Sequence, residues 1–115
     1  MSWIDEALLY DCYGNAEVIE QVNGELAERD PDRRQQFAPL DMDAAGGAKF
    51  FTGNVWAAAF NYVLPEHIKA AVAGASWRHP ENVVLILDGD SYEEGAEVWT
   101  VAQLRAASSR MGGEG

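Results

Sequence analysis

An acidic segment in the second half of the chain has the residue types that bind cations. It contains four carboxylates within residues 88–94, at Asp88, Asp90, Glu93 and Glu94. Calcium takes six to eight oxygen ligands, which clustered carboxylates supply. The calcium-loop pattern requires Gly at its sixth position and Glu at its twelfth, but Glu93 and Trp99 stand there. We therefore favour a solvated turn over a weak cation site, and we expect no metal.

The two histidines and the single cysteine are the other side chains suited to metal binding or catalysis. His67 and His79 lie twelve residues apart, whereas zinc ligands usually come as close pairs with thiolates or further imidazoles. We expect both histidines on the surface or at helix ends. Cys12 has helical spacing with Ile4 and Leu8, which favours the inner face of a helix, where a cysteine behaves as a small hydrophobic residue.

Established nucleotide and hydrolase motifs are missing from the sequence. Gly46 and Gly47 precede Lys49, but the phosphate-loop spacing GxxxxGKS/T requires glycine directly before the lysine. The zinc motif HExxH and the nucleophile elbow GxSxG are also missing. We expect no cofactor and no enzymatic activity. The alternative is a small enzyme or ligand-binding domain whose site forms only in the folded chain.

Charge is the strongest remaining signal. The 115 residues include 19 Asp and Glu against 8 Lys and Arg, for a net charge of −11. Direct binding of nucleic acid needs the opposite sign. No stretch approaches the roughly 20 apolar residues of a membrane span, and the start of the chain does not resemble a signal peptide. We expect a cytoplasmic protein with one domain over residues 1–111 and a disordered tail at 112–115.

Hydrophobic patterning predicts two helices in the first part of the chain. Residues 2–12 read as one helix, with Ser2 as its N-cap. Residues 15–28 read as a second helix with two distinct sides. Its apolar side consists of Val18, Ile19, Val22 and Leu26. Its polar side carries Glu17, Glu20, Glu25 and Glu28. Short strands near residues 37–42 and 49–51 are expected in the loop-rich stretch that follows.

The second half of the chain predicts a β-α-β-β core. Residues 55–63 fit either a strand or a helix, and we favour a strand because β-branched and aromatic residues dominate the ends of the segment. A helix from Pro65 then leads to a strand at 83–87, whose five apolar residues indicate burial on both faces. Residues 97–101 return as a hairpin. The fold class expected is α+β, with a small mixed sheet packed against the helices.

The end of this core predicts one more helix. Thr100 and Gln103 have the spacing of a capping box, and the helix that they begin ends near Gly112. The aromatic residues of the second half are expected in the core. They are Trp56, Phe60, Tyr62, Trp77 and Trp99.

The carboxylates predict a basic protein partner. Residues three or four apart on a helix have Cβ atoms about 5–6 Å apart, and duplex DNA carries one charge per about 1.7 Å of its axis. A helix row and a hairpin row of carboxylates would imitate part of a phosphate row. The expected partner-binding residues are Glu17, Glu20, Glu25, Glu28, Asp88, Asp90, Glu93, Glu94 and Glu97.

In size and charge the chain resembles small acidic inhibitors. These include phage anti-restriction and anti-CRISPR proteins, and immunity proteins that block basic nuclease toxins. The resemblance is one of composition and identifies no residues. It implies a non-enzymatic inhibitor of a nuclease or of another nucleic-acid-binding protein. Two alternatives are a protein whose acidity serves solubility alone and a subunit of a larger assembly that buries an aromatic surface.

Overall fold

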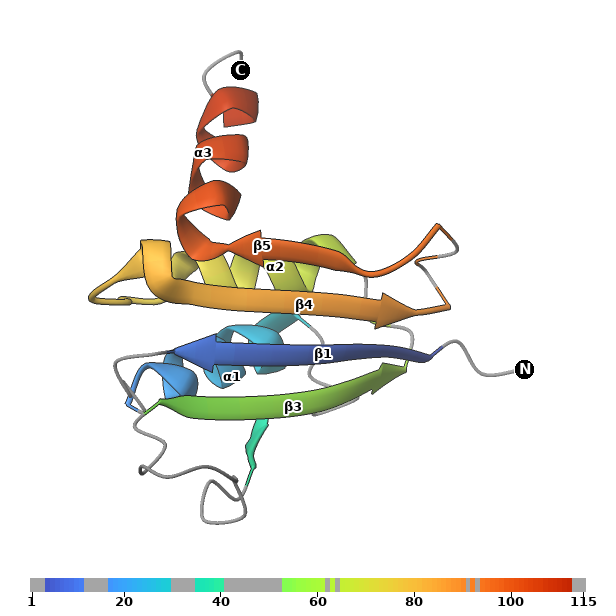
Figure 1. The fold of residues 1–115 in the computed structure, drawn as a ribbon. Coiled ribbons are helices and arrows are strands. Elements are labelled where there is room, and N and C mark those ends of the chain that lie inside the picture. The colour runs from blue at the N-terminus through green and yellow to red at the C-terminus, as the bar shows by residue number, and fades with distance from the viewer. Residues whose placement is uncertain are drawn as a thin grey trace, which may run out of the picture.

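The computed structural model describes residues 4–11, 17–29, 35–40, 53–61, 63, 65–90, 92 and 94–112. In these ranges five strands form one sheet, in the order β2-β3-β1-β4-β5, and three α-helices accompany it. Figure 1 shows α1 and α2 behind the sheet and α3 rising from the end of β5. The predicted α+β class is confirmed.

The helix expected over residues 2–12 is wrong, because this segment forms the central strand, β1 (Ile4–Asp11). Ala7 and Leu9 are buried on the helix side, while Leu8 is 42% exposed on the other side. The apolar run from Ala7 to Tyr10 is so short that it fits both the 3.6-residue period of a helix and the two-residue period of a strand. Pairing with a strand on each side decides the matter. The inward position expected for Leu8 is therefore also wrong.

The sheet is antiparallel rather than mixed. β3 (Asn54–Asn61) and β4 (Val83–Gly89) both pair antiparallel with β1, so they run in the same direction, as expected for a strand–helix–strand crossover. They are not neighbours, because β1 lies between them. β5 (Glu97–Thr100) forms the predicted hairpin with β4, and the two-residue β2 (Ala38–Pro39) flanks β3.

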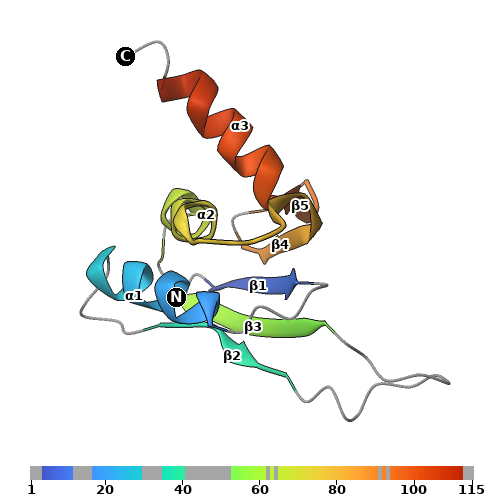
Figure 2. The same cartoon turned by 90° about the vertical axis from the view of Figure 1, so that its left-hand side faces the viewer.

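Burial of the strand β4 is one-sided, and the burial expected on both of its faces is therefore wrong. Val83, Leu85 and Leu87 are fully buried, whereas Val84 and Ile86 are half-buried on the side without helices. The continuous apolar run predicted burial on both faces. In the structure, helices cover only one of them (Figure 2).

The helices agree well with the sequence patterns. α1 (Val18–Arg29) matches the helix expected over 15–28, and α2 (Pro65–Gly74) begins at the expected proline. A short 3-10 helix, η2 (Pro80–Asn82), precedes β4. α3 (Val101–Gly112) follows β5 directly. Among helices in the described part of the chain, none has the length and apolar character needed to cross a membrane.

The predicted capping box at the start of α3 is confirmed. The backbone N–H of Gln103 donates to Thr100 Oγ1 at 3.1 Å, and the backbone N–H of Thr100 donates to Gln103 Oε1 at 2.8 Å. Farther along α3, the Arg105 guanidinium donates to the carbonyls of Ala73 and Ala75 at 2.9 and 2.7 Å. These carbonyls lie at the end of α2, so Arg105 satisfies acceptors that a helix terminus leaves open.

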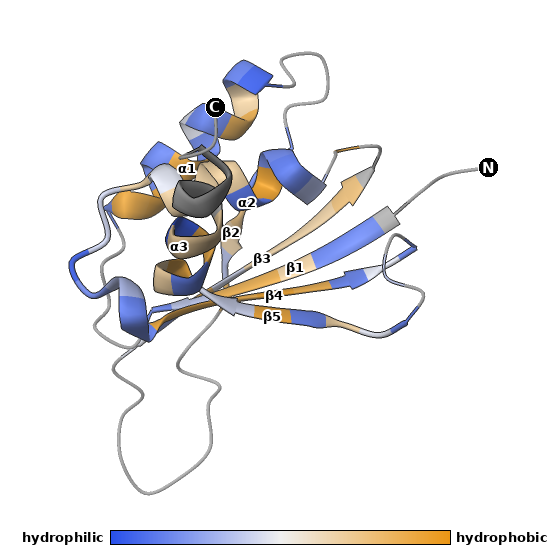
Figure 3. Cartoon of the chain, turned by 90° about the horizontal axis from the view of Figure 1, so that it is seen from above, coloured by the Kyte–Doolittle hydropathy of each residue, from blue (hydrophilic) through white to orange (hydrophobic). Residues whose placement is uncertain are grey.

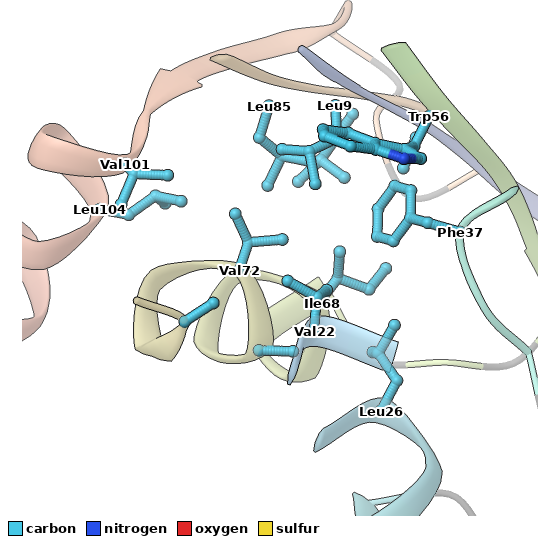
Figure 4. Packing of buried hydrophobic residues seen from close by; sticks show 14 of the residues in the cluster. Leu9, Val22, Leu26, Phe37, Trp56, Ile68, Val72, Leu85, Val101 and Leu104 are labelled. Atoms are coloured by element: carbon cyan, nitrogen blue, oxygen red, sulfur yellow. The ribbon is translucent and has the colours of Figure 1, made fainter. Parts of the chain in front are cut away.

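The core lies between the sheet and the helices (Figure 4). Trp56 and Phe60 on β3 are buried as predicted, and Phe60 meets Phe37 edge-on with ring centroids 5.6 Å apart. Trp56 lies 6.2 Å from the buried Trp77, whose Nε1 donates to the carbonyl of Val72 at 2.7 Å. These contacts confirm the core assignment of the three residues.

Several expectations fall outside the described residues. They concern the N-cap at Ser2, the core position of Cys12, the strand at 49–51, the glycines before Lys49, the core position of Tyr62, and the tail beyond Gly112. The strand expected near 37–42 is present in part, as β2.

Candidate functional site

α1 presents a row of carboxylates to solvent. The opposite side of the helix is fixed in the core by Val18, Val22 and Leu26. Helical periodicity therefore turns the polar side outward, and its exposed members include Glu17, Glu20 and Glu28. No ion pair within the described residues involves these three.

The fourth glutamate expected in this row is already partnered. Glu25 Oε1 accepts a hydrogen bond from Arg29 Nε at 2.8 Å, one helical turn away. An exposed pair of this kind contributes little stability, but it neutralises the charge of Glu25 locally. Three carboxylates face solvent without a counter-ion among the described residues. We define them as the α1 row: Glu17, directly before α1, with Glu20 and Glu28 on the helix.

The hairpin does not present a second continuous row. Asp88 lies at the end of β4, where its Oδ1 accepts from the Gly89 backbone N–H at 2.8 Å. Asp90 and Glu94 are exposed in the turn, and Glu93 is outside the described residues. Glu97 points toward the helices, because its neighbour across the hairpin is the buried Leu87. The predicted set is therefore divided between two faces of the sheet.

Glu97 links the strand β5 to the helix α2. Its Oε1 lies 2.8 Å from Lys69 Nζ and accepts from Trp99 Nε1 at 2.9 Å. Lys69 Nζ also lies 5.0 Å from the centre of the Trp99 ring. The hydrogen bond from Lys69, together with that from Trp99, holds the pKa of Glu97 below its ordinary value. This carboxylate is thus engaged by α2 and β5 rather than offered to a partner.

The α1 row and the hairpin turn lie at different ends of the sheet. Figures 1 and 3 both show α1 on one side of the view and the turn between β4 and β5 on the other. A single partner surface that contacts both would have to reach around the sheet. Because the α1 row follows a single helix and the residue before it, it is the better candidate for recognition.

The two histidines do not belong to a metal-binding group in the described ranges. His79 is exposed, with its Nδ1 3.7 Å from Glu81 Oε1, and His67 is half-buried on α2. Within the described residues no group of three or more His, Cys, Asp and Glu side chains is placed to hold a metal ion.

Three buried polar side chains near the sheet were not predicted from the sequence. Asp5 and Asp11, at opposite ends of β1, are each only 2% exposed on the helix side. The hydroxyl of Tyr92 is buried and has no hydrogen-bond partner among the described residues. Burial raises the pKa of this hydroxyl, and the charges of Glu97 and Asp5 raise it further. The alternation of β1 places Asp5 and Asp11 inside, which only the strand assignment reveals.

The face of the sheet that carries no helix is largely apolar, and we call it the open face. Its side chains follow from the strand register. They include Leu8, Ala57, Val84, Ile86 and Val98. At the elbow between β5 and α3, a groove of about 300 Å³ is lined by Val98, Trp99, Gln103 and Ala106. Reasoning from the sequence missed this face, because it treated β1 as a helix and β4 as buried on both sides.

The two candidate surfaces are therefore the α1 row and the open face. In comparisons with protein-family models, curated proteins and solved structures, nothing matches the chain.

Proposed function

We propose that this protein is a non-enzymatic acidic binding module that inhibits a basic protein, a nuclease or another nucleic-acid-binding protein. The α1 row would occupy the part of that protein which otherwise contacts phosphates. The observation that carries the proposal is the exposure of Glu17, Glu20 and Glu28 on one side of α1 without a counter-ion among the described residues.

The attachment of α1 to the rest of the fold supports this role. Asn23 is hydrogen-bonded to the backbone of Phe37, and Gln21 Oε1 accepts from the Ser76 backbone N–H at 2.9 Å. A helix fixed at two points keeps its carboxylates in place before binding. Less conformational freedom is then lost when a partner binds.

Charge gives the proposed complex a distinct signature. A net charge of −11 attracts a basic protein over a distance and speeds its association. The attraction is screened by salt, so the affinity falls as ionic strength rises. A phosphate-binding surface is the natural target, because it is already arranged to pair with a row of negative charges.

The experiment compares three versions of the protein as immobilised baits in a lysate of the source cells. One is the wild type. The second carries Glu17→Gln, Glu20→Gln and Glu28→Gln. The third carries Asp88→Asn, Asp90→Asn and Glu94→Gln, which removes the same charge from the hairpin. Captured proteins are eluted with salt and quantified by mass spectrometry.

We expect the wild type and the hairpin variant to capture the same basic nucleic-acid-binding protein, and the α1 variant to lose it. Adding the purified wild type should then block nucleic acid binding by the captured protein. Equal capture by all three baits would contradict the role of the α1 row. Capture that does not respond to salt, or a captured protein without nucleic acid binding, would contradict the proposed function itself.

A further inference from the structure

We infer that the open face is the docking surface for a second copy of this chain, which packs on it sheet against sheet. The inference is separate from the proposed function, because the open face and the α1 row lie on opposite sides of the sheet. Figure 2 shows the helices on one side only.

A continuous apolar row crosses the open face. Leu8 on β1 stands directly opposite Ala57 on β3 and Ile86 on β4, and Ile86 stands opposite Val98 on β5. Leu8 is 42% exposed and Val98 is 63% exposed. An antiparallel sheet with one side in water normally places polar residues on that side, so this row indicates a covered surface.

The area of the open face suits a dimer. The strands β2, β3, β1, β4 and β5 have 2, 8, 8, 7 and 4 residues. With strands about 4.8 Å apart and a rise of about 3.3 Å per residue, the face covers on the order of 460 Å². Two copies would together bury at most about 900 Å², so the expected dimer is a weak one, of the class of interfaces below about 1,200 Å². The apolar part of this area is the centre of the face, where Leu8 and Val98 are exposed and Ala57, Val84 and Ile86 are half-buried. Contiguous exposed apolar surface of this kind marks an interaction site.

The distribution of charge on the face favours a second copy over a basic partner. The apolar row contains no charged residue, so burial against an identical row leaves no unpaired charge. Carboxylates occur at one end, where Glu6 and Asp88 stand opposite each other. At the other end of the face stand the uncharged Tyr10 and Thr100.

This polarity also determines how the two copies are arranged. A two-fold axis between the sheets and perpendicular to the strands places the Glu6 end of each copy over the Tyr10 end of the other. The carboxylates of the two copies are then as far apart as the face allows. An axis parallel to the strands would instead bring all four together. We therefore expect the first arrangement, a contact in which both copies use the same surface.

Sedimentation equilibrium over a wide range of protein concentration tests the inference directly. We expect the wild type to shift with concentration from the mass of one chain to twice that mass. High salt should strengthen the dimer, because it screens repulsion between two chains of charge −11. The complex of the proposed function responds to salt in the opposite way, so the two proposals can fail independently.

Leu8→Lys is the variant that locates the interface. It places two unpaired charges in the centre of the contact and should raise the dissociation constant at least about tenfold. Ala27→Lys makes the same charge change at an exposed position on α1 and should leave the dimer intact. Circular dichroism and thermal unfolding establish that each variant is folded. A wild type that stays monomeric at high concentration and high salt would overturn the inference, as would a folded Leu8→Lys variant that dimerises like the wild type.

Discussion

Asn23 on α1 makes two hydrogen bonds with the backbone of a single residue, Phe37. Its Nδ2 donates to the Phe37 carbonyl at 3.1 Å, and its Oδ1 accepts from the Phe37 N–H at 2.8 Å. The side-chain amide thus substitutes for a strand partner directly before β2. It also keeps the Phe37 ring in place against Phe60, so one side chain links α1 to the edge of the sheet.

Replacing this amide should destabilise the protein. Asn23→Ala removes both hydrogen bonds and leaves the partly buried N–H and carbonyl of Phe37 without their partner. We expect the free energy of unfolding to fall by about 1–3 kcal/mol, measured by urea denaturation. Gln21→Ala removes one exposed hydrogen bond, to Ser76, and serves as a milder comparison. Equal stability of Asn23→Ala and the wild type would show that the link is energetically unimportant.

Substitution of Gly24, the residue after Asn23, should instead stabilise the protein. Gly24 lies inside α1, and a Cβ built on it would have no atom within 4 Å beyond its own helix and chain neighbours. Gly24→Ala restricts the unfolded chain and introduces no clash, so we expect a gain of about 0.5–1 kcal/mol in the free energy of unfolding. A loss of stability in the same urea experiment would contradict the open environment described for this glycine.

Gly53 should not tolerate the same substitution. A Cβ there would lie 2.8 Å from Cε2 of Tyr10 and 2.9 Å from the backbone oxygen of Asp11. The Asp11 oxygen belongs to the central strand and cannot move without disturbing the sheet. We expect Gly53→Ala to lower the free energy of unfolding by about 1–3 kcal/mol. Thermal unfolding of the two alanine variants side by side gives the comparison. Similar melting temperatures of Gly24→Ala and Gly53→Ala would contradict the clash described for Gly53.

The contacts of Glu97 predict a pH dependence of stability. Hydrogen bonds from Lys69 and Trp99 lower the pKa of this carboxylate in the folded protein below the ordinary value of 4.5. The folded state therefore binds the proton less readily than the unfolded state. The stabilisation is present above the unfolded pKa and is lost as the pH falls through the folded pKa.

Unfolding in urea from neutral pH to about pH 3 measures this contribution. Glu97→Gln should show a smaller loss of stability on acidification than the wild type, because it has no carboxylate to protonate. Lys69→Met should also reduce the loss, since it removes the first of the two hydrogen bonds. Identical pH profiles for the wild type and Glu97→Gln would be inconsistent with the lowered pKa.

Much of the secondary structure could be predicted because its signals are local. The side of α1 that packs in the core follows from the spacing of Val18, Val22 and Leu26, and the start of α3 follows from the capping box. Both signals come from residues three or four positions apart, so they can be recognised without knowing how distant segments pack. The exposure of the α1 row was predictable for the same reason, since a helix with one buried side must turn its other side to solvent.

The part of the candidate site on the hairpin could not be predicted in the same way. The sequence places Asp88 and Glu97 in one acidic segment, but the register sends them to opposite faces of the sheet. Lys69 then engages Glu97 from α2. Neither relationship can be inferred from spacing, because each depends on where a distant element packs.

The sequence by itself determined the acidity, the helices α1 and α2, the β4–β5 hairpin and the outward carboxylates of α1. Only the tertiary structure decided that residues 4–11 are the central strand and that one face of the sheet is open. The physical reason is that a short apolar run such as that from Ala7 to Tyr10 fits the residue spacing of a helix as well as that of a strand. Hydrogen bonds to β3 and β4, which come from distant parts of the chain, select the strand. Helices packed on one side then leave Leu8 facing outward.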